Sequence, residues 1–172
     1  EGVIDFCDRL NRYYPQFTGD KKDAVELWQL LCHSSGLSDE AMSAYVADYI
    51  KEELGITLSE NCPFDDYRAA VLQAREKLGL PEDDSNEAFE ETETLLKLKA
   101  PLAADPHTAF NYCSTGYGLL GLLIEKLTGE DIESYASRRV FAPLGMTDTH
   151  FILPKNKWRR VLKRDPSFCF AD

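Results

Sequence analysis

Apolar residues recur at helical spacing along most of the chain, and capping residues or glycines stand at the ends of these runs. Between Ser38 and Gly55, apolar side chains lie three or four positions apart, with Ser38 placed as an N-cap and Gly55 as a stop. Patterns of this kind occur six times in all and predict helices over residues 23–31, 39–54, 65–78, 86–99, 116–127 and 131–141.

Strand patterns are few. Residues 149–153 form the best short candidate, and residues 54–58 form a poorer one. Residues 116–127 are apolar almost all round, which is typical of a central buried helix. We therefore predict a mainly α chain with little or no sheet, folded as a single helical lobe over residues 1–172.

Charge restricts the possible partners. The net charge of −11 argues against nucleic acid, because phosphate binding needs clustered cations. Six cations do gather between Lys155 and Arg164, at the start of a basic C-terminal segment over residues 155–172. We interpret it as a solvated stretch that leads towards a further part of the fold. A lipid- or anion-binding patch is the alternative, but the spacing shows no clear amphipathic face.

No apolar run approaches the roughly 20 residues of a membrane span, and the start of the sequence shows no signal-peptide pattern. The five cysteines are scattered and lack zinc-site spacing, which predicts buried reduced thiols in a cytoplasmic protein. Phosphate-binding loops and metal motifs such as H-E-x-x-H are also missing from the sequence, so we expect neither a metal nor a cofactor.

Three short motifs follow one another along the chain: LLCHSSGL at residues 30–37, FNYCSTGYGLLG at 110–121 and FAPLGMTDTHF at 141–151. They resemble LLxHTSGL, Y-x-N and PLGMxDTxF of the serine β-lactamase and penicillin-binding-protein-like hydrolases, a family that includes the class C β-lactamases. Three matches in the family's order are more specific than any one alone. The resemblance extends from Gly2 to about Pro154 and corresponds to the central segment of such an enzyme.

The resemblance implies a fold in which a helical lobe packs beside a mixed α/β lobe. This chain would hold the helical lobe, with residues 38–99 as a lobe-specific helical elaboration. It also implies a serine hydrolase that acylates a serine with a small ester, amide or lactam substrate. The S-x-x-K nucleophile motif is expected before Gly2 and the K-[ST]-G strand beyond Asp172, so we expect the chain alone to be inactive.

Tyr112 stands at the tyrosine of Y-x-N, which the resemblance implies is the general base of the complete enzyme. A phenol has a reference pKa of about 10, so a tyrosine acts as a base near neutral pH only if a nearby cation stabilises the phenolate. In the family that cation is the S-x-x-K lysine. In this chain alone, Tyr112 is interpreted as a half-buried tyrosine at the entrance of the next helix.

Two positions depart from the family pattern. Ser114 replaces the asparagine of Y-x-N, whose amide contacts the acyl side chain of the substrate. A hydroxyl is shorter, so this contact would be lost or mediated by water, which favours an esterase, peptidase-like enzyme or transferase over an efficient β-lactamase. His107 replaces the glycine of a P-G-T turn, and we expect a changed turn there. The resemblance gives His33 a structural role, as an anchor of the loop after its helix.

Two alternatives to this interpretation stay open. In the first, the chain is a non-catalytic helical interaction or scaffold module derived from the family. In the second, it is a hydrolase with an internal nucleophile such as Ser34 or Cys113. If it is one part of a larger fold, residues 116–127 should expose an apolar face. Self-association or pairing with the rest of the fold would then cover that face.

Overall fold

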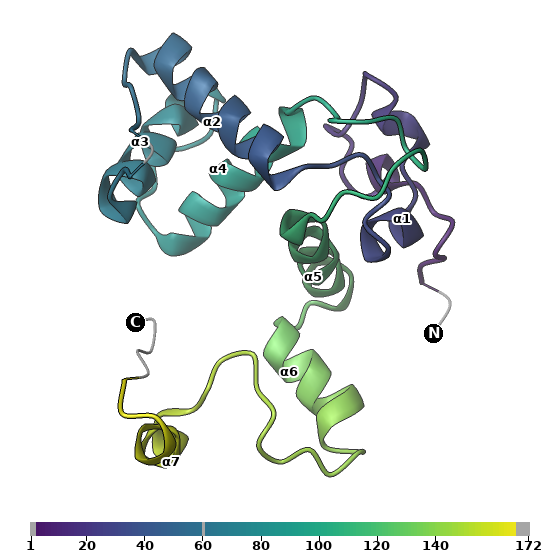
Figure 1. Cartoon of the computed structure of the whole chain (residues 1–172), viewed down its shortest axis with the longest axis vertical. Coiled ribbons are helices and arrows are strands. Elements are labelled where there is room, and N and C mark those ends of the chain that lie inside the picture. The colour runs from purple at the N-terminus through teal and green to yellow at the C-terminus, as the bar shows by residue number, and fades with distance from the viewer. Residues whose placement is uncertain (1–2, 60, 168–172) are drawn as a thin grey trace. The chain divides into compact units, whose positions relative to one another are not determined.

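The structure is a computed structural model that describes residues 3–59 and 61–167 (Figure 1). Its regular elements are almost all helical, and the described residues contain no strand; one isolated antiparallel bridge joins Arg9 and Glu26. The predicted mainly α fold is confirmed. The α-helices are α1 Leu27–Leu31, α2 Asp39–Leu54, α3 Phe64–Lys77, α4 Asn86–Lys99, α5 Ser114–Thr128, α6 Ile132–Ala136 and α7 Lys155–Arg164. Short 3₁₀ turns occupy Leu10–Arg12 and Lys22–Ala24, and a π-helical turn, Ser137–Phe141, follows α6.

The chain forms two compact units, with the boundary between Leu120 and Gly121, inside α5. In the first unit, α2, α3 and α4 pack against one another (Figure 1). Their buried side chains come from all three helices: Val46, Ile50, Ala70, Val71, Ala74 and Leu96. Ser38 caps α2 by accepting a hydrogen bond from Ala41 N, and Gly55 ends it with a φ of 70°. Both roles were predicted from the sequence.

Two buried cations hold α4 in place. The guanidinium of Arg75, 3% exposed, donates to Ala88 O at 2.8 Å and to Thr92 Oγ1 at 2.7 Å. Lys22 Nζ donates to the last carbonyls of α4, Leu98 O at 2.9 Å and Lys99 O at 3.0 Å. A cation at a helix C-terminus also interacts favourably with the helix dipole. Each cation therefore has hydrogen-bond acceptors that compensate for its burial.

The helix predicted over residues 23–31 is shorter than expected. Val25 is extended, since its carbonyl accepts from Leu10 N at 2.9 Å, and the bridge to Arg9 keeps Glu26 extended too. A capping box between Glu26 and Gln29 then starts α1 at Leu27. Tertiary contacts therefore outweigh the helical spacing of the first residues.

Residues 149–153 do not form the predicted strand. Their backbone has no partner strand among the described residues, and two of its N–H groups donate to a side-chain carboxylate instead. Glu133 Oε2 accepts from Phe151 N at 2.5 Å and from Ile152 N at 3.2 Å. The apolar residues here therefore belong to a loop, and two of its backbone N–H groups donate to a side chain.

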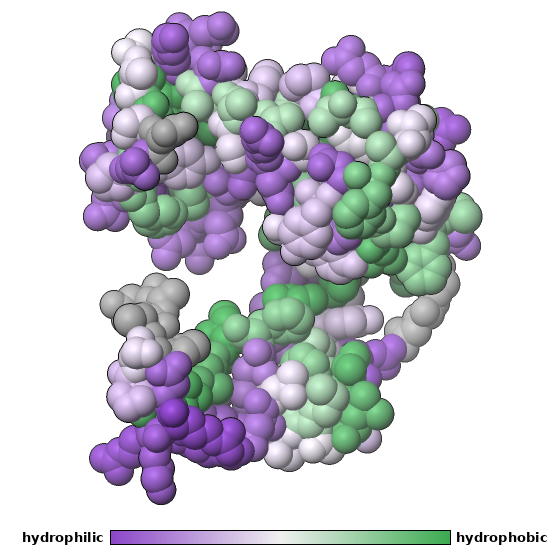
Figure 2. Space-filling model, viewed as in Figure 1, coloured by the Kyte–Doolittle hydropathy of each residue, from purple (hydrophilic) through white to green (hydrophobic). Residues whose placement is uncertain are grey.

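The basic segment begins with an amphipathic helix, α7, contrary to the sequence interpretation. Trp158, Val161 and Leu162 are spaced i, i+3 and i+4 along it, and five of the six cations lie away from this face. Lys155 borders the face, with its Nζ 5.7 Å from the centroid of the Trp158 ring. Figure 2 shows the deep purple of hydrophilic side chains over α7. Because only three apolar residues mark its face, the pattern was missed. Residues 168–172 lie outside the described part of the chain.

Of the four described cysteines, all of them free thiols, only Cys113 is buried, whereas Cys7 and Cys32 are exposed. The prediction that the thiols are buried is therefore wrong for these two, and Cys169 lies outside the described residues. Within residues 3–59 and 61–167, no helix has the length and apolar content needed to cross a bilayer.

Candidate functional site

Two of the three sequence motifs lie side by side, because the loop after α1 is hydrogen-bonded to the segment that leads into α5. Ala103 N donates to Gly36 O at 2.8 Å, His107 N to Ser34 O at 2.7 Å, and Asn111 N to His33 O at 2.8 Å. These bonds fix Tyr112, the next residue, relative to α1. We call residues 32–38 and 101–113 the loop pair.

The loop pair approaches so closely that only glycine fits at residue 36. Gly36 has a φ of 82°, and a Cβ built there would lie 2.1 Å from Ala104 O. Glycine is therefore required both by its left-handed backbone and by the lack of space for a side chain.

His33 supports the segment before α5. Its Nδ1 accepts a hydrogen bond from Cys113 N at 3.2 Å, so the ring proton of the neutral imidazole lies on Nε2. Its ring packs against three aromatic rings, with centroid distances of 4.6 Å to Tyr112, 5.3 Å to Tyr117 and 5.7 Å to Phe110. These contacts fit the structural role that the family resemblance implies for His33.

Tyr112 is exposed rather than half-buried, with 65% of its surface accessible. No hydrogen bond joins its phenol oxygen to another described residue. The backbone on both sides is fixed by Asn111 and Cys113, and the ring rests on His33. The phenol oxygen is thus held in place by the ring and is available to a group from outside the described residues.

Asp39, the first residue of α2, caps the N-terminus of α5. Its carboxylate accepts from Ser114 N at 2.6 Å, from Ser114 Oγ at 2.9 Å and from Thr115 N at 3.0 Å. The Ser114 hydroxyl therefore donates to Asp39. A carboxylate at a helix N-terminus is favoured both by the free backbone donors and by the helix dipole.

The cap changes the ionisation of its neighbours. Burial raises the pKa of Asp39, but the hydrogen bonds from Thr115 and Ser114 lower it by more, so it lies well below its usual range. Burial, together with the Asp39 charge, raises the pKa of the Cys113 thiol to about 11. Cys113 is therefore a thiol near neutral pH, and only the thiolate is a good nucleophile. This disfavours Cys113 as an internal nucleophile.

The start of α5 is fastened to α1 and to the N-terminal segment. Tyr117 Oη donates to Leu31 O at 2.7 Å, and Tyr14 Oη donates to Leu119 O at 2.9 Å. At Gly116 a Cβ would lie 3.2 Å from Leu30 Cδ2, so the two helices approach closely. One side of α5 is buried through Leu119 and Leu123, while Tyr117 and Leu127 are exposed, so the helix is less buried than its composition predicts.

His107 does not change the turn in the way that we expected. It takes the positive φ itself, 65°, where the family has glycine. Its exposed ring meets Trp28 edge-on at a centroid distance of 5.1 Å. A left-handed conformation costs a non-glycine residue about 1 kcal/mol or more, and an aromatic contact offsets part of that cost.

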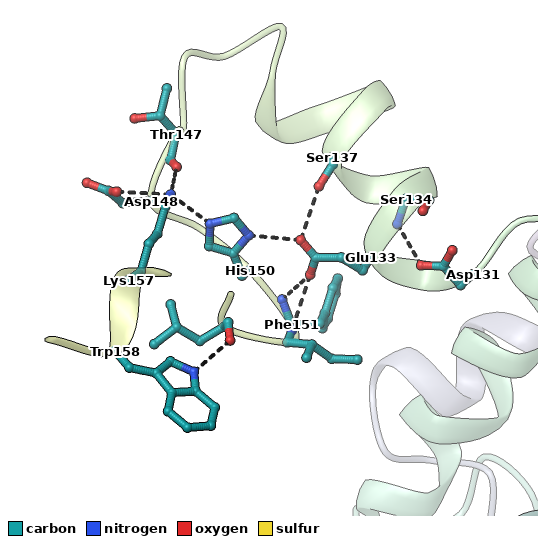
Figure 3. A network of polar contacts seen from close by, with 12 residues as sticks. Asp131, Glu133, Ser134, Ser137, Thr147, Asp148, His150, Phe151, Lys157 and Trp158 are labelled. Atoms are coloured by element: carbon teal, nitrogen blue, oxygen red, sulfur yellow. Dashed lines mark hydrogen bonds and ion pairs between the residues drawn. The ribbon is translucent and has the colours of Figure 1, made fainter. Parts of the chain in front are cut away.

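The third motif builds a polar cluster in the second unit, centred on Glu133 of α6 and His150 (Figure 3). Glu133 Oε1 lies 2.9 Å from His150 Nδ1, and His150 Nε2 lies 2.9 Å from Lys157 Nζ. Because an ammonium only donates, Nε2 accepts and Nδ1 carries the proton. The remaining Lys157 donors go to Thr147 O and to Asp148 Oδ1.

This cluster clamps the loop between α6 and α7, because its hydrogen bonds join Glu133 of α6 to His150 in the loop and His150 to Lys157 of α7. The charged groups of the cluster thus have partners within it. Burial raises the pKa of Glu133, but hydrogen bonds from His150, Phe151 N and Ile152 N lower it by more. All three N–H groups of Lys157 are used. Among the described residues, no group of three or more His, Cys, Asp and Glu side chains is arranged to hold a metal ion.

Glu133→Gln should loosen the clamp, because an amide has one acceptor oxygen where the carboxylate has two. We expect the second unit to lose about 1–2 kcal/mol of unfolding free energy, measured by urea unfolding through Trp158 fluorescence in a Trp28→Phe background. Glu130→Gln is the matched control. Glu130 makes an exposed ion pair with Arg138 at 2.6 Å, and such pairs contribute little. Equal stability losses in the two variants would contradict the clamp.

The sequence model of the Beta-lactamase family matches residues 1–165. The chain belongs to the Beta-lactamase family. The loop pair and the turn before α5 therefore lie within a family domain, and the predicted resemblance is confirmed.

The chain is similar to proteins of this family whose names give different activities. The chain is 24% identical over 169 residues to the ML-236A carboxylate methylbutanoyltransferase of Penicillium citrinum, an alignment that covers 89% of the chain and 33% of the relative. It is 33% identical over 151 residues to a putative D-alanyl-D-alanine carboxypeptidase of Escherichia coli K12, covering 88% and 29%. With penicillin-binding protein 4 of Amycolatopsis lactamdurans it shares 46% identity over 41 residues, covering 24% and 11%. The chain spans about a third or less of the length of these relatives.

Sequence reasoning missed three contributors to the site. Asp39 was taken only as the first residue of a helix, because no local pattern shows a cap reaching a helix 75 residues away. Phe110 and Tyr117 were not singled out, although they lie within the quoted motif. Their proximity to His33 depends on the loop pair, which is a tertiary feature.

Proposed function

We propose that the chain is part of a serine hydrolase that works through a serine acyl-enzyme, with Tyr112 as the general base. The exposed Tyr112 phenol supports this proposal, because it is held by His33 and has no hydrogen-bond partner among the described residues. A base must be positioned and free to receive a proton. The serine and the lysine of S-x-x-K come from another segment of the polypeptide.

In this mechanism Tyr112 accepts the proton of the serine hydroxyl, helped by the lysine cation that stabilises its phenolate. The serine oxygen bonds to the carbonyl carbon of the substrate. The bond to the leaving alcohol or amine breaks, and the leaving group takes the proton. Water, or a second alcohol in a transferase, then attacks the acyl-serine and releases the serine.

Ser114, the first residue of α5, takes the position of the family asparagine, two residues after Tyr112. Its hydroxyl donates to Asp39, so it offers an acceptor lone pair to a substrate but no free donor. This favours an esterase, a peptidase-like enzyme or a transferase over an efficient β-lactamase that would need an asparagine amide as donor. The similar proteins include a methylbutanoyltransferase and a putative D-alanyl-D-alanine carboxypeptidase, and both names are consistent with acyl transfer.

Labelling with a fluorophosphonate probe, read by intact mass, tests the proposal. We expect the chain of residues 1–172 to stay unmodified. The polypeptide that carries this chain together with S-x-x-K should gain one adduct, mapped to that serine.

Two other outcomes of the labelling have clear meanings. A stoichiometric adduct on Ser34, Ser35 or Ser114 of residues 1–172 would show an internal nucleophile. The absence of an adduct on the longer polypeptide, with its fold verified by circular dichroism, would favour the non-catalytic scaffold module instead.

A further inference from the structure

Helix α7 carries a concentrated positive charge in a chain that is otherwise acidic. Residues 155–164 contain six lysines and arginines and no aspartate or glutamate, whereas the net charge of the whole chain is −11. Arg159, Lys163 and Arg164 are exposed, and no ion pair joins any of them to a carboxylate among the described residues. These three cations are therefore available to an anionic partner.

The helix is fastened to the loop that precedes it. Trp158 Nε1 donates to Leu153 O at 3.0 Å. One residue earlier, Lys157 Nζ donates to His150 Nε2 at 2.9 Å. The exposed cations are thus presented on a helix that is already fixed relative to this loop, so a partner would order few additional residues on binding.

The same loop places apolar side chains beside the basic helix. Phe151 and Ile152 are 62% and 76% exposed, and Leu162 of α7 is 38% exposed. The N–H groups of residues 151 and 152 donate to the Glu133 carboxylate, so the loop cannot turn these side chains inward without breaking both bonds. In Figure 2, green apolar surface adjoins the deep purple of α7. Cations and apolar side chains therefore share one part of the second unit.

This combination distinguishes between kinds of polyanion. A DNA or RNA duplex would match the cations through its phosphates, but its charged outer surface would leave the apolar side chains in water. An anionic bilayer presents charged headgroups above an apolar layer, so it can accept both kinds of side chain. Salt screens charges beyond about 8 Å, so the local charge of α7 decides the attraction rather than the net charge of the chain.

We propose that α7 and the loop before it form a peripheral membrane-binding surface that recognises anionic lipid headgroups. Arg159, Lys163 and Arg164 contact the headgroups, and the side chains of Phe151 and Ile152 enter the interface. This inference goes beyond the proposed function and does not rest on it, because no step of the acyl transfer involves α7. Binding is reversible, since a few cations and two apolar side chains hold a protein far less tightly than a membrane-spanning helix.

Co-sedimentation of the full-length protein with lipid vesicles tests this surface. Phosphatidylcholine vesicles that contain about 30% phosphatidylserine should bind the protein, and pure phosphatidylcholine vesicles should not. The triple variant Arg159→Gln, Lys163→Gln and Arg164→Gln should bind the anionic vesicles about 100-fold more weakly, because each cation near such a surface contributes roughly a factor of five. Ile152→Ser should weaken binding several-fold and leave its dependence on salt unchanged.

The matched control removes the same charge from another part of the chain. Arg9→Gln, Lys51→Gln and Lys77→Gln change three exposed cations of the first unit. This second triple variant should bind the anionic vesicles like the parent. Equal losses in the two triple variants would overturn the inference, because binding would then follow net charge rather than α7.

Two further results would also overturn the membrane surface. The first is that the full-length protein does not bind anionic vesicles, which includes the case in which the rest of the polypeptide covers α7. The second is that the protein binds a fluorescent DNA duplex as tightly as it binds the vesicles, that the α7 triple variant loses this binding and that Ile152→Ser keeps binding both. None of these measurements needs hydrolase activity, so failure of this inference and failure of the proposed function are distinguishable.

Discussion

Replacing Tyr112 by phenylalanine in the full-length protein should lower kcat for p-nitrophenyl acetate by about 100- to 10,000-fold, the range for loss of a general base. KM should change little, because the ring that rests on His33 is kept and only the phenol oxygen is removed. Steady-state kinetics with p-nitrophenyl acetate give both quantities.

Tyr45→Phe provides the control for this experiment. Tyr45 is a half-buried tyrosine of α2 that stacks on Tyr49, at a centroid distance of 6.5 Å, and it has no role in the proposed chemistry. Its variant should retain the parent kcat. A Tyr112→Phe enzyme that works within twofold of the parent would remove Tyr112 from the mechanism and leave the family resemblance without its proposed base.

Asp39→Asn should destabilise the first unit by about 2 kcal/mol, because the α5 cap loses its charge and one of its two acceptor oxygens. The amide nitrogen of asparagine would face a backbone N–H, so one donor at the start of α5 stays unsatisfied. Urea unfolding followed through Trp28 fluorescence, in a Trp158→Phe background, measures this loss. Trp28 reports on the same unit through its contact with His107.

The same variant should alter the dependence of stability on pH. The folded pKa of Asp39 lies below its unfolded value of about 3.9, so its contribution is complete above pH 5. That contribution falls as the pH drops below 4 towards the folded pKa. Asp39→Asn should therefore flatten the stability curve of the first unit between pH 5 and pH 2.

Asp48→Asn controls for the general effect of removing a carboxylate. Asp48 is exposed on the same helix and takes no part in the cap. It should leave both the stability at pH 7 and its acid dependence close to those of the parent. A comparable loss at Asp48 would mean that net charge, rather than the cap, controls the stability of this unit.

The sequence predicted the parts of the fold that local signals determine. Ser38 and Gly55 bound α2, and Gly129 follows the end of α5, because caps and left-handed glycines act on the residues next to them. The errors came where a distant group acts on the backbone. The Glu133 carboxylate binds the N–H groups of residues 151 and 152, and the Leu10 amide holds Val25 extended.

The candidate site shows the same division. Tyr112, Ser114 and His33 were found from motifs, and the structure places all three around the start of α5. What these residues contact was not predictable, because Asp39 and the loop pair join segments about 70 residues apart. Whether residues 38–99 are an elaboration of the family fold stays a prediction, as does the cytoplasmic location. The same holds for self-association.

The hydrogen bond between Ala103 N and Gly36 O has a consequence for how this part of the family can vary. It brings together the two ends of a stretch of some 65 residues that contains α2, α3 and α4. The chain therefore enters and leaves the α2–α4 bundle at neighbouring points. Such a segment can lengthen, shorten or be exchanged between homologues without moving the loop pair. Position 39 is the exception, because its carboxylate caps α5 from within this segment. A change in the length of the segment therefore has to keep Asp39 beside the start of α5.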